Sequence, residues 1–213
     1  MRTISPSLLS ANFANIEKDI KDTVDAGVTR LHLDVMDGHF VPNLTFGPMV
    51  IKHIRKITTC HLETHLMINK PHKSFDQYIE AGSDTLIFHI EASDDPIRDL
   101  KYIKSKNVLA GIALNPDTHE SSLLPLMDYL DYILIMSVFP GKGGQKFIKS
   151  TLSKMKALSE MKNDRNIVIG VDGGVNTSTI KEVYATGIDI TIVGSAFFNS
   201  KNLNERHDEL LNA

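Results

Sequence analysis

Short apolar runs recur along the chain, each about as long as a buried β-strand. Longer stretches between them repeat their apolar residues at helical spacing. The predicted strands are Ile4–Leu8, Arg30–Val35, His61–Met67, Thr85–His89, Leu109–Leu114, Tyr132–Met136, Ile167–Asp172 and Ile190–Gly194. The predicted helical stretches are Phe13–Ala26, Met49–Lys56, Lys73–Ala81, Ile97–Lys106, Ser121–Asp128, Lys149–Met161 and Thr177–Thr186.

Strands and helices therefore alternate through the chain, and turn residues mark the boundaries. Gly27, Gly82 and Gly187 each follow a helical stretch, where glycine commonly ends a helix. Asn176 precedes another stretch, where asparagine commonly begins one. Eight β/α units over residues 1–213 predict an α/β fold, a single-domain (β/α)8 TIM barrel. An open, doubly wound sheet is the alternative.

Composition disfavours several classes of binding partner and several kinds of covalent or metal site. The 213 residues carry a net charge of −3, which disfavours a broad surface for nucleic acid or for an anionic membrane. Cys60 is the only cysteine, so neither an intrachain disulfide nor a cysteine-based zinc motif can form. No run approaches the roughly 18 apolar residues of a membrane span, and the first residues lack a signal-peptide pattern. We expect a cytoplasmic protein.

Two strand-like phrases contain candidate chemistry. In His32-Leu33-Asp34-Val35-Met36 and His65-Leu66-Met67 the polar residues share one face of each strand, because side chains alternate along a strand. Asp172 lies at the end of another run. Together they predict a divalent-metal site, most simply for Zn²⁺, with Mn²⁺, Fe²⁺ or Co²⁺ as alternatives. The remaining histidines lack comparable partners and are predicted to be structural or solvated: His39, His53, His61, His72, His89, His119 and His207.

The predicted metal site contains two carboxylates, Asp34 and Asp172. Both lie at strand ends, where TIM barrels hold their active sites. Such a pair suits proton transfer at a carbon next to a ketone, with one carboxylate removing a proton and the other returning one to the opposite face. A metal ion would stabilise the oxyanion of the enediolate. Burial and mutual repulsion would raise at least one of the two pKa values. The simpler reading of Asp34 is a structural ligand.

Three methionines, Met36, Met67 and Met136, are predicted to point into the barrel near this site. Methionine usually fills gaps in a core. Here the polarizable thioethers are equally suited to lie against the negative charge of an enediolate while they keep the cavity dry.

Glycine-bearing turns follow the last three predicted strands. The first is Pro140-Gly141-Lys142-Gly143-Gly144-Gln145, which is neither a dinucleotide fingerprint nor a Walker loop. The others are Gly173-Gly174 and Gly194-Ser195, after which a short helix can begin at Ala196. Loops seven and eight with such a helix form the recurrent phosphate site of these barrels. The turns therefore predict a phosphorylated small-molecule substrate.

From Ile4 to about Phe198 the chain resembles the ribulose-phosphate 3-epimerase family. The resemblance rests on several motifs, namely Ile4-Ser5-Pro6-Ser7-Leu8-Leu9, the segment from Leu31 to Thr45, His65-Leu66-Met67, Met136-Ser137-Val138, the segment from Gly143 to Phe147, Val171-Asp172-Gly173-Gly174-Val175 and Val193-Gly194-Ser195-Ala196. It implies a (β/α)8 barrel that interconverts D-ribulose 5-phosphate and D-xylulose 5-phosphate by inversion at C3. Homo-oligomers are common in this family.

The resemblance also implies roles for individual residues. A divalent metal, usually zinc, would be held by His32, Asp34, His65 and Asp172, with the two aspartates as the acid/base pair. Ser7 and His65 would contact the substrate. The sugar-phosphate site would be lined by Gly141, Lys142, Gly143, Gly144, Asp172, Gly173, Gly174, Gly194 and Ser195. The chain departs from the family pattern at Phe139, where a polar residue is usual, and at Lys142, where an aromatic one is.

Three alternatives remain. An epimerase for allulose 6-phosphate has a similar sequence, and Gly173-Gly174-Val175 favours the pentose enzyme over it. Sugar-phosphate decarboxylases and aldol enzymes on related barrels contain the motif Asp-x-Lys-x-x-Asp at the second strand. The aligned positions here are His32, Asp34 and Asp37, without the lysine. A catalytically silent module that binds a sugar phosphate or a metal would need no acid/base pair, which Asp34 and Asp172 supply.

Overall fold

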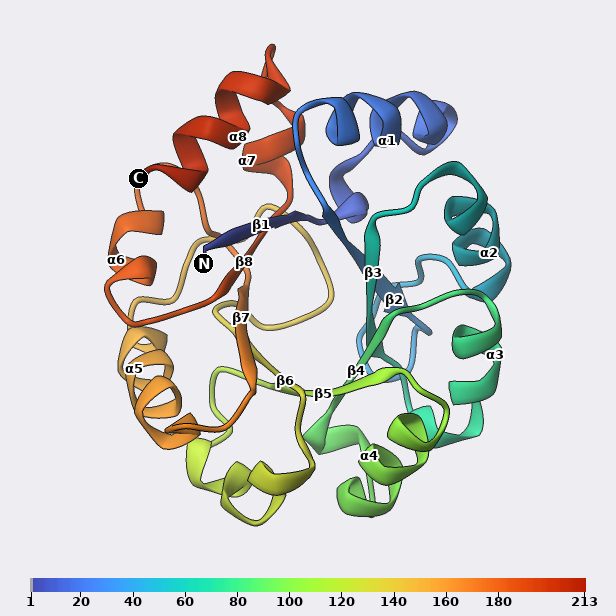
Figure 1. Cartoon of the computed structure of the whole chain (residues 1–213), viewed down its shortest axis with the longest axis vertical. Helices are drawn as coiled ribbons and strands as arrows, with labels where there is room; N and C mark the ends of the chain where they lie inside the picture. Colours follow the sequence, from blue (N-terminus) through green and yellow to red (C-terminus); the bar gives the residue numbers. More distant parts are fainter. Residues whose placement is uncertain (1) are drawn as a thin grey trace.

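The computed structural model describes residues 2–213 and shows eight parallel strands surrounded by helices (Figure 1). The strands follow the order β1-β8-β7-β6-β5-β4-β3-β2. The first and the last strand of the sequence are neighbours, which a barrel requires and an open doubly wound sheet does not allow. This arrangement is therefore the predicted TIM barrel. The strands are β1 (Thr3–Pro6), β2 (Arg30–Met36), β3 (His61–Met67), β4 (Thr85–His89), β5 (Leu109–Leu114), β6 (Tyr132–Met136), β7 (Val168–Asp172) and β8 (Ile190–Val193).

The α-helices form an outer ring around these strands (Figure 1). They are α1 (Ile16–Asp25), α2 (Pro48–Ile57), α3 (Phe75–Glu80), α4 (Pro96–Ser105), α5 (Thr151–Lys162), α6 (Ile180–Tyr184), α7 (Ser195–Phe198) and α8 (Leu203–Leu211). Short 3-10 turns η1 (Leu8–Ser10), η2 (Phe13–Asn15), η3 (Pro71–Lys73) and η4 (Ile90–Ala92) extend several loops. Within residues 2–213, every helix is too short or too polar to cross a membrane.

Two layers of side chains hold the barrel together. Outward-facing strand residues such as Leu31 and Leu33 pack with helical residues such as Ile51 and Ile54 in one large apolar cluster. The inward-facing residues of β6 and β8 form a second apolar cluster, whereas those of β2 and β3 are mostly polar or charged. Half of the barrel interior is therefore an apolar wall and the other half holds the ionisable groups.

The barrel closes between β1 and β2 through polar contacts. A single backbone bridge joins Ser7 to His32, and two serine hydroxyl groups bond to side chains of β2 and of the next strand, β3. The Ser7 hydroxyl donates to Asp34 Oδ2 at 2.5 Å, and the Ser5 hydroxyl donates to Glu63 Oε2 at 2.9 Å. The residues that complete the barrel are thus the neighbours of the predicted metal ligands.

The structure corrects some predicted boundaries. The stretch Ser121–Asp128 lies in a 3-10 helix, η5 (Glu120–Tyr129), because Pro125 inside it cannot donate the hydrogen bond that an α-helix needs. The first strand ends at Pro6, since Leu8 already belongs to η1. Helix α8 was not predicted. The three glycines expected after helices, Gly27, Gly82 and Gly187, do adopt the positive φ that this position favours.

Candidate active site

The four predicted metal ligands meet at the carboxyl ends of β2, β3 and β7. Each of His32, Asp34, His65 and Asp172 offers one atom, and all four atoms lie within 4.8 Å of one another. Asp34 Oδ1 is 3.5 Å from His32 Nε2 and 3.3 Å from His65 Nδ1. Asp172 Oδ2 is 4.0 Å and 3.8 Å from the same two nitrogens. The parallel strands bring together residues that are up to 140 positions apart in the sequence.

The arrangement fits a divalent ion. Atoms bound tetrahedrally at about 2.1 Å from an ion lie about 3.4 Å from one another, close to the 3.3–4.0 Å separations seen here. Two imidazole nitrogens and two carboxylate oxygens are donors that zinc and other divalent transition metals accept. Both imidazoles are completely buried, so these donors are held in place by the barrel rather than by mobile loops.

Further buried groups orient the two imidazoles. Glu63 Oε2 lies 3.3 Å from His32 Nδ1, and Arg30 donates to Glu63 Oε1 at 2.6 Å. His89 Nε2 lies 2.9 Å from His65 Nε2. The prediction that His89 has no comparable partner was therefore wrong. Alternation along β4 places His89 on the inner face at the carboxyl end, so its position in the strand was a usable signal.

The two carboxyl groups have very different proton affinities. Burial and the negative charge of Asp34 raise the pKa of Asp172 to about 7. Burial alone would also raise the pKa of Asp34, but the charge and hydrogen bonds of His32 and His65 hold it well below its usual value. Burial lowers the pKa of His65 to about 4. Near neutral pH the site thus holds one carboxylate that stays ionised and one that readily gains or loses a proton.

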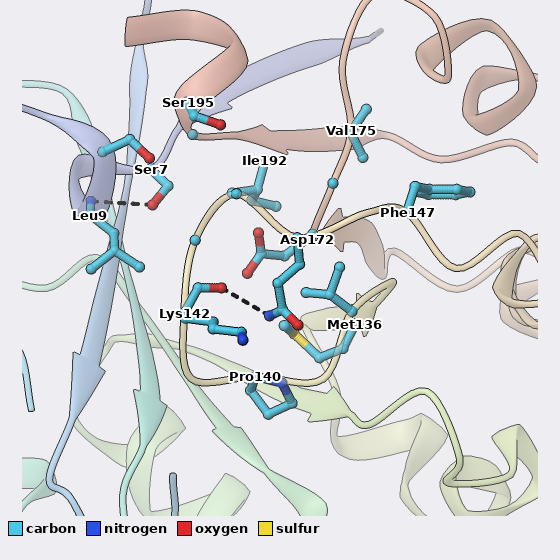
Figure 2. Close-up of a pocket in the computed structure, with 18 of the residues that line it drawn as sticks. Ser7, Leu9, Met136, Pro140, Lys142, Phe147, Asp172, Val175, Ile192 and Ser195 are labelled. Atoms are coloured by element: carbon cyan, nitrogen blue, oxygen red, sulfur yellow. Dashed lines mark hydrogen bonds between the residues drawn. The ribbon is translucent and has the colours of Figure 1, made fainter. Parts of the chain in front are cut away.

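A cavity of about 480 Å³ opens above the four ligands. Figure 2 shows the Asp172 carboxylate in this pocket, with Met136 and Ile192 beside it. Ser7, Asp34 and the methionines Met36 and Met67 also line it, while the buried His32 and His65 do not. All three glycine-bearing turns contribute, through Gly141, Lys142, Gly143, Gly144, Gly173, Gly174, Gly194 and Ser195. The structure thus places the predicted phosphate-binding residues around one pocket.

The loop after β6 reaches across the mouth of the barrel (Figure 1). Asn43, in the loop after β2, donates its side-chain amide to Gly141 O at 2.9 Å. Gln145 donates to Phe139 O at 2.7 Å and to Lys142 O at 2.9 Å, the second bond being visible in Figure 2. Gly174 has a φ of 67°, and a Cβ there would lie 2.8 Å from Gln145 O. Glycine is therefore needed where this loop packs on the turn after β7.

Several residues of the pocket were not predicted. Some of them stand inside the motifs quoted above but were given no role, and the others belong to no motif: Leu9, Ser10, Gln145, Lys146, Phe147, Lys149, Asn176, Thr179 and Ile192. Some of them are explained by close contacts, since a Cβ on Gly194 would lie only 2.6 Å from the Ser10 hydroxyl. The glycine turns were predicted to bind a phosphate, and the side chains that crowd them were not predicted.

Comparison with known proteins identifies the family. The model described as the ribulose-phosphate 3 epimerase family matches residues 3–198. The chain belongs to the ribulose-phosphate 3-epimerase family. Ribulose-phosphate 3-epimerase of Bacillus subtilis (strain 168) is 40% identical over 213 residues, which cover 99% of this chain and 98% of that one. The protein of the same name from Escherichia coli (strain K12) is 41% identical over 210 residues, covering 97% and 93%. The chain is thus an epimerase.

Solved structures support the fold of this epimerase. The crystal structure of 3-hexulose-6-phosphate synthase from Salmonella typhimurium superposes with a TM-score of 0.72 at 17% identity, covering 99% of this chain and 97% of that one. At this identity the likeness concerns the barrel alone. The motifs, and not the barrel, separate the epimerase family from such neighbours.

The two positions that were expected from the sequence to differ from the family pattern, Phe139 and Lys142, both lie on the loop after β6. Phe139 is 53% exposed, and Lys142 is exposed among the residues that line the pocket. The backbone carbonyl groups of both residues accept the Gln145 side-chain amide, which links these two positions of the loop.

Proposed function

We propose that this epimerase interconverts D-ribulose 5-phosphate and D-xylulose 5-phosphate by proton transfer at C3. One observation carries the proposal: Asp34 and Asp172, from strands on different sides of the barrel, converge at the base of a pocket lined by three glycine-bearing turns. Inversion at a carbon needs two acid/base groups that reach its two faces. A phosphate needs backbone amides that can approach it closely, which glycine turns allow.

The two aspartates would act in alternation. One carboxylate takes the proton from C3, and the bonding electron pair moves into an enediolate of the substrate. The other carboxyl group then gives its proton to the opposite face of C3. The unequal pKa values of the pair support this division, because near neutral pH Asp34 is ionised while Asp172 can carry a proton.

Other residues of the site would assist Asp34 and Asp172 in proton transfer. His32, Asp34, His65 and Asp172 would hold a divalent ion, whose positive charge would favour the negative oxygen of the enediolate. The Ser7 hydroxyl donates to Asp34 Oδ2 and so fixes the direction of its other oxygen. Met36, Met67 and Met136 are nearly completely buried around the pocket and would exclude water while they lie against the developing charge.

Proton NMR in deuterium oxide tests the proposal directly. The protein loaded with Zn²⁺, and in parallel with Mn²⁺, Fe²⁺ or Co²⁺, is incubated with D-ribulose 5-phosphate. We expect deuterium at C3 together with signals of D-xylulose 5-phosphate. Asp172→Asn should still bind the sugar phosphate but turn over about 10²- to 10⁴-fold more slowly, because it lacks one acid/base group.

Two results would contradict the proposal. Near-normal turnover by Asp172→Asn would remove this residue from the mechanism. Wild-type protein that exchanges no proton of ribulose 5-phosphate with any of the ions, but does exchange one of allulose 6-phosphate, would assign the pocket to the six-carbon substrate.

A further inference from the structure

His89 is a completely buried, titratable group that the proton-transfer scheme leaves without a role. It ends β4, and its ring is nearly coplanar with that of His65, with ring centres 5.0 Å apart and planes 25° from parallel. The two rings also approach edge to edge, since His65 Nε2 lies 2.9 Å from His89 Nε2. Such a short distance between two nitrogens requires one proton between them, because two protons would clash and two lone pairs would repel.

The position of that proton follows from the ligand set. His65 Nδ1 points toward Asp34 Oδ1, 3.3 Å away, and toward Asp172 Oδ2, 3.8 Å away. To bind a cation, Nδ1 must carry no proton. The proton of a neutral His65 is then on Nε2, which donates to His89 Nε2. As an acceptor at Nε2, a neutral His89 must carry its own proton on Nδ1.

Glu91 completes the chain of hydrogen bonds. Its Oε2 lies 3.1 Å from His89 Nδ1, where it accepts that proton. Its Oε1 accepts hydrogen bonds from the Asn115 backbone N–H at 2.9 Å and from the Thr118 hydroxyl. These donors keep Glu91 in an acceptor-only form and fix its direction. While a cation is bound, His65, His89 and Glu91 can therefore each be protonated in only one way.

We propose that His89, oriented by Glu91, is a positioning residue that fixes the tautomer and direction of His65 for metal binding. The inference rests on the proposed metal set and extends it from four residues to the groups behind them. Partners behind metal-bound histidines commonly contribute 10- to 100-fold to affinity. His89 touches neither the cavity nor the proposed substrate, so it would act on the ion only through His65.

Metal affinity, measured without turnover, tests this role. Metal-free protein is titrated with Zn²⁺ or Co²⁺ against a coloured chelator. His89→Phe keeps an aromatic ring but removes the acceptor, and we expect about 10- to 100-fold weaker binding. His89→Gln restores an acceptor oxygen toward His65 and a donor toward Glu91, and should recover most of the affinity. Phe40→Leu is the matched control, because Phe40 packs on the His89 ring, 4.8 Å between centres, without a hydrogen bond to it. It should bind metal like the wild type.

Nitrogen NMR of ¹⁵N-histidine-labelled, metal-free protein near pH 7 provides a second readout. We expect His65 protonated at Nε2 and His89 protonated at Nδ1. A wild-type His65 protonated at Nδ1, or a folded His89→Phe with undiminished metal affinity, would overturn the role of His89 alone. Wild-type protein that binds none of the ions would instead refute the metal set on which it rests. Circular dichroism and the unfolding midpoint of each variant separate a loss of affinity from a loss of folding.

Discussion

Gly170, in the middle of β7, offers a sharp test of how the barrel interior positions Asp172. The two residues lie on the same face of one strand, two positions apart. A Cβ on Gly170 would lie 2.9 Å from Tyr132 Cζ and 3.0 Å from Cε1, and closer still to the hydroxyl oxygen. Tyr132 is 1% exposed, so its ring has no free space into which it can retreat.

The expected cost of Gly170→Ala follows from these contacts. Replacing a strand glycine with alanine stabilises a protein by about 0.4–1 kcal/mol through the unfolded chain. Overpacking a filled core costs about 1–3 kcal/mol. Because two ring atoms and the hydroxyl oxygen of one rigid side chain crowd the new methyl group, the upper part of that range applies. We therefore expect a net loss of about 2 kcal/mol in the free energy of unfolding, with a lower kcat because Asp172 moves with the strand.

Urea unfolding of four proteins measures this effect: the wild type, Gly170→Ala, Tyr132→Leu and the double variant. Tyr132→Leu opens space for the methyl group, so the cost of Gly170→Ala should fall by at least about 1 kcal/mol in that background. Gly47→Ala is the control, because a Cβ there meets no atom within 4 Å, and it should cost less than about 1 kcal/mol. A cost of Gly170→Ala that is near zero, or the same with Leu at position 132, would refute the reasoning.

Three further predictions concern pH, the loop and the phosphate. Burial and the charge of Asp37 raise the pKa of Tyr78 to about 12, whereas an unfolded tyrosine ionises near pH 10. The folded protein should therefore lose up to about 2.7 kcal/mol of stability from this group as the pH rises from 10 to 12. Unfolding measured against pH should show a smaller loss of stability for Tyr78→Phe. Asn43→Ala removes the bond to Gly141 O, worth about 0.5–1.5 kcal/mol, and steady-state kinetics should show KM about 2- to 10-fold higher; an unchanged KM would show that the loop does not depend on this bond. Lys142→Met should raise KM at low ionic strength and flatten its dependence on salt, and parallel salt profiles would mean that Lys142 does not attract the phosphate.

Local patterns were sufficient to predict most of the barrel. Strands such as β5 and β6 are apolar runs of strand length, and their bounds agree with the prediction. The prediction failed where one sequence pattern was opposed by another or was too weak to recognise. Apolar spacing suggested a helix at Ser121–Asp128, but Pro125 breaks the hydrogen bonding. Helix α8 was missed because its sequence is mostly polar and only Leu210 is completely buried.

Some residues of the site could likewise be predicted from local patterns, and others could not. The convergence of the proposed metal ligands was predictable because strand alternation and strand ends determine where His32, Asp34, His65 and Asp172 point. The contact between Asn43 and Gly141 joins residues 98 positions apart through loops, for which no periodicity exists. His89 was overlooked because each histidine was judged by its sequence neighbours, whereas its partner comes from the adjacent strand.

The polar closure between β1 and β2 has a consequence for synthesis of the chain. Strand β1 is synthesised 187 positions before its ladder partner β8, residues Ile190–Val193. Until then Ser7 has no fixed position beside Asp34, and Asp172 has itself only just been made. Between synthesis of His65 and of Asp172, a nascent chain therefore carries three of the four proposed metal ligands without the strand pairing that arranges them. Long-range pairing of this kind is slow to form. Binding of an ion at the proposed site should thus come late and report on the completion of folding.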